Sequence, residues 1–120
     1  MQLTKGRVEA EISTRIIQFE KEHMGRGPTE AKTYILKDMV LVRLKNVLTP
    51  AERELSKTKE GKVLIKQVRI QLFENSRSML EELMADVLDA SVMSLHSDIS
   101  TVTGERVIVF ILNRNVEDDF

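Results

Sequence analysis

Two separated groups of residues in this chain carry atoms that could bind a ligand. The first is the run GRGP at 25–28, where Arg26 stands between Gly25 and Gly27. Glycines leave backbone N–H groups accessible, so a phosphate or carboxylate could contact Arg26 and the Gly27 amide together. The same run is typical of a helix end, since Gly25 can adopt a left-handed conformation and Pro28 cannot continue a helix. We favour the helix end, with Arg26 exposed to solvent.

The second group is His96 and Asp98, which are alternate residues of a predicted strand and can therefore point to the same side. With His23 or Asp38 nearby, they could bind a metal through imidazole and carboxylate groups. Two candidate ligands are too few to predict a metal, and a polar strand facing solvent explains the same residues. We predict no metal site and no cofactor.

A catalytic set is not evident in the sequence. His96 as a general base has no convincing nucleophile, because the serines at 94, 97 and 100 lack the strand-turn-helix setting of a nucleophile elbow. The chain has no cysteine, which excludes thiol catalysis and disulfides. We predict that the protein is not an enzyme and has no catalytic residue.

If a ligand site exists, we expect it where the GRGP turn and the strand of His96 approach each other. It would comprise Arg26, Gly27, His96 and Asp98. A permanent cation, an accessible amide and an imidazole that titrates near neutral pH would suit a small anion such as phosphate or bicarbonate.

Composition limits the classes of partner. The 120 residues fit a single domain, 1–120, and 18 Lys and Arg residues nearly balance 19 Asp and Glu residues, so no global field attracts nucleic acid or membrane. The single Tyr and the absence of Trp leave little to stack on bases, so nucleic acid is not favoured. No secretory signal or transmembrane segment is evident, and we expect a cytoplasmic protein that can still meet a protein partner at the membrane. Small-anion or nucleic-acid binding stays open as an alternative function, through the basic residues Arg26, Lys62, Lys66, Arg69 and Arg77.

Hydrophobic periodicity predicts the elements of the first half. A helix over 5–24 has apolar residues at one helical face, with Glu20 among its solvated residues. Two strands, 33–36 and 39–44, flank a two-residue turn at Lys37 and Asp38. Thr49 is a natural N-cap for a short helix, in a capping box with Glu52.

The second half begins with a long helical segment after Gly61, whose apolar residues include Val68, Leu72 and Met79. A strand over 91–102 alternates, with Met93, Leu95 and Ile99 on its apolar side. A strand over 107–112 is apolar on both faces, which predicts that both are covered. The acidic tail, 113–120, is predicted to be frayed.

The resulting order, α-ββ-αα-ββ, predicts an α+β fold with two layers, a four-stranded mostly antiparallel sheet and helices on one face. Because the strand over 107–112 has a second apolar face, we expect a homodimer.

Four ordered blocks, at 5–12, 20–44, 48–62 and 96–112, resemble a bacterial family named after the C component of the sodium-translocating membrane-potential-generating system. The resemblance covers nearly the whole chain. It implies an accessory role in ion or bicarbonate transport. Together with the absent catalytic set and the second apolar face of the strand over 107–112, this predicts a non-catalytic accessory or regulatory protein. One departure is Asp89-Ala90, where the family resemblance leads us to expect a glycine between the long helix and the third strand.

Overall fold

The computed structural model describes residues 4–120. It contains four helices, four strands and a final 3-10 helix: α1 (Lys5–His23), β1 (Glu30–Leu36), β2 (Met39–Lys45), α2 (Pro50–Leu55), α3 (Lys59–Asn75), α4 (Arg77–Leu88), β3 (Val92–Ile99), β4 (Arg106–Leu112) and η1 (Val116–Asp119). The predicted order is confirmed. The long helical segment is divided at Ser76 into α3 and α4.

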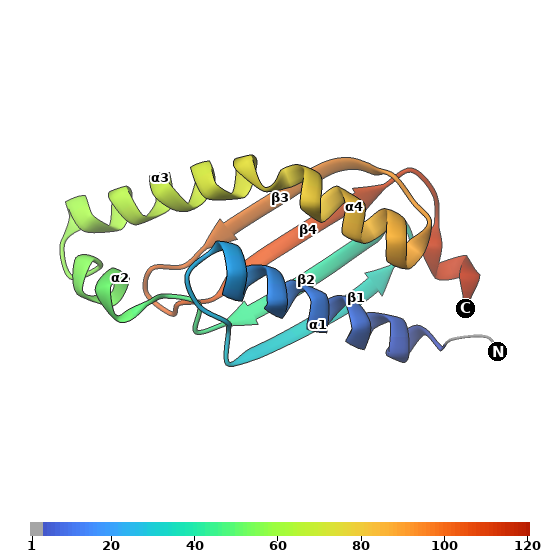
Figure 1. Cartoon of the computed structure of the whole chain (residues 1–120), viewed down its shortest axis with the longest axis horizontal. Coiled ribbons are helices and arrows are strands. Elements are labelled where there is room, and N and C mark those ends of the chain that lie inside the picture. The colour runs from blue at the N-terminus through green and yellow to red at the C-terminus, as the bar shows by residue number, and fades with distance from the viewer. Residues whose placement is uncertain (1–3) are drawn as a thin grey trace.

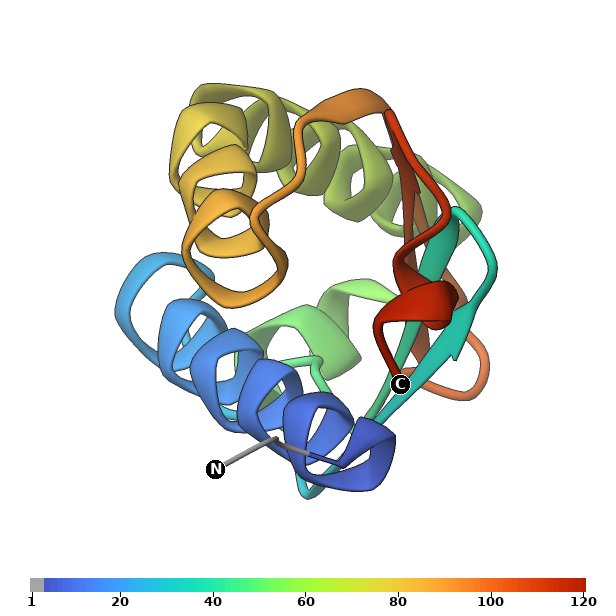
Figure 2. The ribbon, with the colours of Figure 1, turned by 90° about the vertical axis from the view of Figure 1, so that its right-hand side faces the viewer.

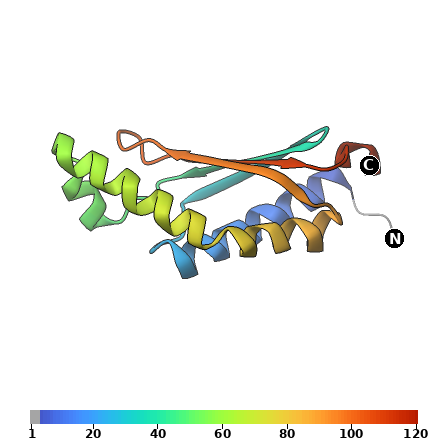
Figure 3. The same ribbon diagram turned by 90° about the horizontal axis from the view of Figure 1, so that it is seen from above.

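The four strands form one antiparallel sheet in the order β1-β2-β4-β3, so β1 and β3 are its opposite edges (Figure 1). α1, α3 and α4 lie on the same side of the sheet, and no helix of the described residues crosses the other side (Figure 3). The end-on view shows the same arrangement, with helices on one side of the strands (Figure 2). The α+β fold with helices on one face is therefore confirmed.

Local signals set the first half of the fold. Val8, Ile12 and Ile16 of α1 are buried against the sheet, as their spacing predicts. α1 ends at His23, and Gly25 follows with a φ of +104°, a conformation that costs glycine little. The helix end predicted from GRGP is thus confirmed.

The first hairpin and its following helix also form as predicted. β1 and β2 pair from Leu36–Met39 outward, and Lys37 in the two-residue turn has a φ of +59°. The Thr49 hydroxyl accepts a hydrogen bond from the Glu52 backbone N–H at 3.1 Å, and the Glu52 carboxylate accepts one from the Thr49 backbone N–H at 2.9 Å. The capping box at the start of α2 is therefore complete.

α3 buries a narrower face than its sequence suggests. Its buried residues are Gly61, Ile65, Arg69 and Phe73, spaced four apart. A Cβ at Gly61 would lie 1.8 Å from the Leu55 carbonyl oxygen, so only glycine allows α2 to approach α3 this closely. The remaining large apolar residues of α3 are exposed: Val63, Leu64, Val68, Ile70 and Leu72. The periodicity predicted that Val68 and Leu72 would be buried, and this prediction is wrong.

Two further expectations are wrong. The pairing of β3 with β4 shifts between Val92 and Ser94, so Met93 lies in a bulge and is 67% exposed instead of facing the core. The tail is packed and not frayed: Val116 is fully buried, and the Glu117 carboxylate accepts a hydrogen bond from the Lys37 backbone N–H at 3.0 Å.

Candidate functional site

The structure does not bring the GRGP turn and the strand of His96 together. The turn precedes β1 at one edge of the sheet, whereas His96 and Asp98 belong to β3 at the other edge. Arg26 Nη1 donates a hydrogen bond to the Leu48 carbonyl oxygen at 3.3 Å, at the start of the α2 segment. The predicted common site of Arg26, Gly27, His96 and Asp98 is therefore not formed, and ligand binding by any one of them stays a prediction.

The polar residues of β3 are engaged locally. His96 Nε2 lies 3.1 Å from Ser94 Oγ. Asp98 Oδ1 accepts a hydrogen bond from the Ile99 backbone N–H at 2.8 Å and lies 3.4 Å from Lys66 Nζ on α3. Within residues 4–120, no three His, Cys, Asp or Glu side chains are grouped so that they could hold a metal ion.

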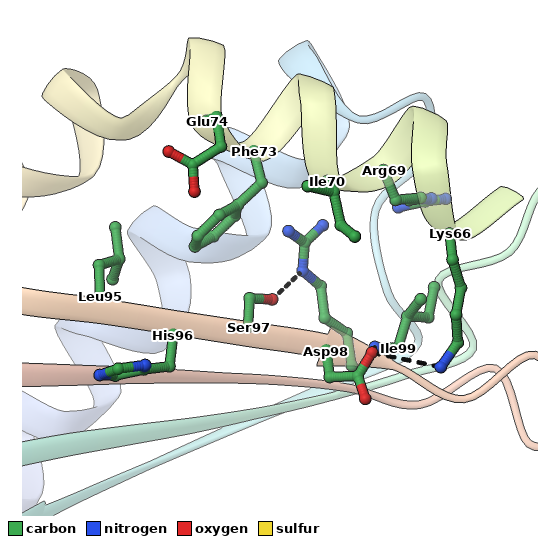
Figure 4. Close-up of a pocket in the computed structure, with 11 residues that line it drawn as sticks. Lys66, Arg69, Ile70, Phe73, Glu74, Leu95, His96, Ser97, Asp98 and Ile99 are labelled. Carbon is green, nitrogen blue, oxygen red and sulfur yellow. Dashed lines mark hydrogen bonds and ion pairs between the residues drawn. The ribbon is translucent and has the colours of Figure 1, made fainter.

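His96 and Asp98 do line a cavity of about 320 Å³ between α3 and the edge strand β3, which we call the α3–β3 groove. Figure 4 shows Ile70 and Phe73 projecting from α3 toward β3, and the Lys66–Asp98 ion pair spanning the groove. The cavity is large enough for a side chain or a small ligand. Its lining comprises five residues of α3, five of β3 and one of β4: Lys66, Arg69, Ile70, Phe73, Glu74, Leu95, His96, Ser97, Asp98, Ile99 and Arg106.

Arg106 is the buried cation of this groove. Its Nε donates a hydrogen bond to Ser97 Oγ at 3.0 Å, its Nη1 lies 3.5 Å from both carboxylate oxygens of Glu20, and its guanidinium carbon lies 4.8 Å from the centroid of the Phe73 ring. Burial lowers the pKa of Arg106, although the nearby Glu20 carboxylate opposes that shift. Among the described residues, Nη2 of Arg106 has no hydrogen-bond acceptor.

A second buried arginine lies beside the first. Arg69 donates from Nε to Glu52 Oε2 at 2.9 Å, and from Nη2 to Glu52 Oε1 at 2.6 Å and to the Val47 carbonyl oxygen at 2.9 Å. Its Nη1 is buried with no partner in the described chain. Partial burial favours a higher pKa for Glu52, but hydrogen bonds from Arg69 and from the Thr49 backbone outweigh it and lower that pKa.

Glu20 completes this buried group of charges. It is fully buried on α1, and burial raises the pKa of its carboxyl even though Arg106 and Arg69 favour the ionised form. The assignment of Glu20 to the solvated side of the helix is therefore wrong. The spacing could have shown this, because Glu20 continues the buried row of Ile12 and Ile16 at intervals of four residues.

Neither Arg106 nor Phe73 was predicted from the sequence to line a groove. Arg106 begins the apolar strand β4 at a buried position, and a charge in line with the buried residues of a central strand indicates an internal partner.

Comparison with known proteins gives the chain a family. The family model described as the Na+-translocating membrane potential-generating system (MpsC) matches residues 4–114. The chain belongs to the MpsC family.

Two Bacillus subtilis (strain 168) proteins are similar to this MpsC-family chain. The uncharacterised protein YbcI is 44% identical over 117 residues, which cover 98% of the chain and 94% of YbcI. The uncharacterised protein YrhF is 27% identical over 109 residues, which cover 90% of the chain and 89% of YrhF. No solved structure matches the chain. None of the helices in the described part of the MpsC-family chain combines the length and apolarity needed to cross a bilayer.

Several basic residues of α3 and α4 form ion pairs within the chain. Arg69 is turned inward to Glu52, and Lys66 lies 3.4 Å from Asp98. Arg77 lies 3.0 Å from Glu81. Ion pairs within the chain therefore take up much of the basic run that favoured the nucleic-acid alternative.

The second notable surface is the helix-free side of the sheet, which we call the outer sheet face. It comprises the outward residues of the two central strands and the apolar residues beside them on β1: Met39, Leu41, Val107, Val109, Ile111, Tyr34 and Leu36. The central five are half-buried and the two on β1 are exposed. Both faces of β4 are apolar as predicted, but within residues 4–120 no helix covers the outer one.

Proposed function

We propose that this MpsC-family chain is a non-catalytic accessory or regulatory protein that acts as a homodimer, with the outer sheet face as the contact between the two copies. The observation that carries the proposal is the uneven covering of the sheet: three helices pack on one side (Figure 3), and on the other side the strand register places apolar residues next to one another across β1, β2 and β4. Apolar patches of this kind on a soluble domain mark interaction sites.

The charges beside the outer sheet face favour a second copy as the occupant. Arg43 Nη2 lies 2.7 Å from Glu105, and Lys45 Nζ lies 3.4 Å from Glu30, so much of the charge around the apolar centre is neutralised within one chain. Two such faces can therefore meet about a twofold axis with little repulsion between like charges.

We propose that the chain has its accessory role in the system that the family description names, a Na+-translocating system that generates membrane potential. The proposed role is to bind a protein partner at the membrane and to affect ion or bicarbonate transport by that partner. The proposal rests on the family membership and on the exposed interaction surfaces.

Light scattering at micromolar concentration tests the homodimer. The expected mass is twice the 13.7 kDa of one chain. A monomer at every concentration would contradict the proposed contact.

The accessory role is tested in cells from which the gene is deleted. Sodium-dependent membrane potential and bicarbonate uptake should fall, and the wild-type chain should restore both. Unchanged potential and unchanged uptake in the deleted strain would contradict the link to transport.

A further inference from the structure

We propose that the α3–β3 groove binds a short extended segment of a protein partner, which adds as a strand to the free edge of β3 and places an acidic side chain against Arg106. The inference rests on the proposed role as a partner-binding accessory protein, and it names the chemistry of the segment that is bound.

β3 is an edge strand of the sheet. Within residues 4–120, β3 pairs with β4 and with no other strand, so one side of its backbone has no strand beside it there. The Ser100 N–H donates to the Glu105 carbonyl oxygen at 2.8 Å. Ser100 and every second residue before it in β3 therefore direct their backbone N–H and C=O groups to β4. The backbone groups of Leu95 and Ser97 therefore point to the free edge, available to an added strand.

The cavity lies directly inside the free edge of β3. Lys66, Ile70 and Phe73 of α3 face Leu95 and Ile99 of β3 across it. A strand added to an edge sends alternate side chains to the same side, and a pocket beside the edge can receive one of them. Main-chain hydrogen bonds then supply affinity and the pocket supplies specificity.

The pocket combines an apolar wall with a buried cation. Its apolar wall includes Phe73 and Leu95, and its buried cation is Arg106, whose Nη2 has no acceptor in the described chain. The hydrogen bonds of Arg106 to Glu20 are long, at 3.5 Å, so its charge is only partly compensated. A carboxylate on the added segment, next to an apolar residue, complements this wall.

The part of the β3 edge that an added strand can use is short. The bulge at Met93 interrupts the edge at one end. At the other end, the Asp98 carboxylate already accepts a hydrogen bond from the Ile99 N–H and pairs with Lys66. The edge between these limits suits a short segment. A free small anion would leave the edge backbone unused.

The experiment selects binders from a phage-displayed library of random linear peptides on the full chain. The expected peptides carry an acidic residue flanked by apolar residues. In NMR titration, a synthetic copy should shift the backbone amides of Leu95 and Ser97. N-methylation of the peptide at the residues that bond the edge should weaken binding about fivefold to tenfold, and N-methylation at the alternate residues less than about twofold.

Two variants on α3 serve as a matched pair. Lys66→Glu places a negative charge at the groove and should weaken the selected peptide about tenfold. Lys62→Glu makes the same change on an exposed residue of α3 that does not line the groove, and binding should change less than about twofold.

Several results would overturn the inference. One is that the library yields no peptide that binds the chain. Another is that N-methylation weakens peptide binding equally at every position. Phosphate or acetate giving the same shifts with the same affinity would show a small-anion site instead. Peptides that shift Val109 and not Ser97 would remove the groove as the binding site and leave the proposed accessory role intact. A peptide that converts dimers to monomers from the groove would make the groove the contact between copies and overturn the outer-face dimer.

Discussion

Nη1 of Arg106 on β4 lies 3.5 Å from both carboxylate oxygens of Glu20 on α1, and both side chains are buried. The pair joins the helical layer to β4, one of the two central strands of the sheet. Removing one partner of a buried pair leaves an uncompensated charge, so Glu20→Ala should lower the free energy of unfolding by about 3 kcal/mol. Urea denaturation at neutral pH measures this change.

Glu22→Ala is the matched control, because Glu22 is exposed on the same helix. Its effect should stay within about 0.5 kcal/mol. Equal effects of the two substitutions would show that the Glu20–Arg106 pair contributes nothing specific.

Glu20 and Glu52 should affect the pH dependence of stability in opposite directions. Burial raises the folded pKa of Glu20 above 4.5, so the folded state holds its proton longer and the contribution of Glu20 is lost as pH rises from 4.5 through the folded pKa. The folded pKa of Glu52 lies below 4.5, so its contribution is present above 4.5 and is lost as pH falls through that pKa.

The measurement compares the wild type with Glu20→Gln and with Glu52→Gln, by urea denaturation across the acidic range. The stability difference between wild type and Glu20→Gln should shrink as pH rises, and the difference for Glu52→Gln should grow. Parallel slopes would contradict the assigned pKa directions.

The N-cap of α2 gives a third prediction. Thr49→Ala removes the hydroxyl that accepts the hydrogen bond from the Glu52 N–H, and it should lower the free energy of unfolding by about 1 kcal/mol. Thr14→Ala is the control, since Thr14 is exposed within α1 and caps nothing. Denaturation midpoints that coincide for Thr49→Ala and the wild type would show that the cap does not contribute.

Local patterns predicted those parts of the fold that depend on neighbours in sequence. The buried stripe of α1, the turn at Lys37 and the capping box at Thr49 all arise within a few residues. Buried charges could not be predicted from local patterns, because Glu20 and Arg106 are 86 positions apart. A charged residue considered without its distant partner is assigned to the solvent-exposed surface. The same limit explains the candidate site: Arg26 precedes the edge strand β1 and His96 lies on the opposite edge strand β3, and no local spacing reveals that strand order.

Asp89 adopts a backbone conformation that its residue type disfavours. It ends α4 with φ 49° and ψ 50°, the left-handed conformation that glycine adopts most easily, at the position where a glycine was expected. Asp89→Gly should therefore raise the free energy of unfolding by about 0.5 kcal/mol, since relief of strain exceeds the added entropy of the unfolded chain. Asp89→Ala, which keeps a Cβ and loses the polar side chain, should lower it. Thermal denaturation of the two variants decides the matter, and a less stable Asp89→Gly would contradict this explanation of the turn.

The outer sheet face gives the last prediction. Val109 lies on the outward side of the central strand β4, whereas its neighbour Phe110 is fully buried on the other side. Val109→Lys places a charge at the centre of the proposed contact, where it would be buried without a partner, and should weaken dimerisation by at least about tenfold. Val102→Lys makes the same change on a side chain that is 80% exposed in the β3–β4 loop, and the dimer should be unaffected. Light scattering over a dilution series, with circular dichroism to verify the fold of each variant, distinguishes the two. If both variants keep the wild-type mass at all dilutions, the outer sheet face is not the dimer contact.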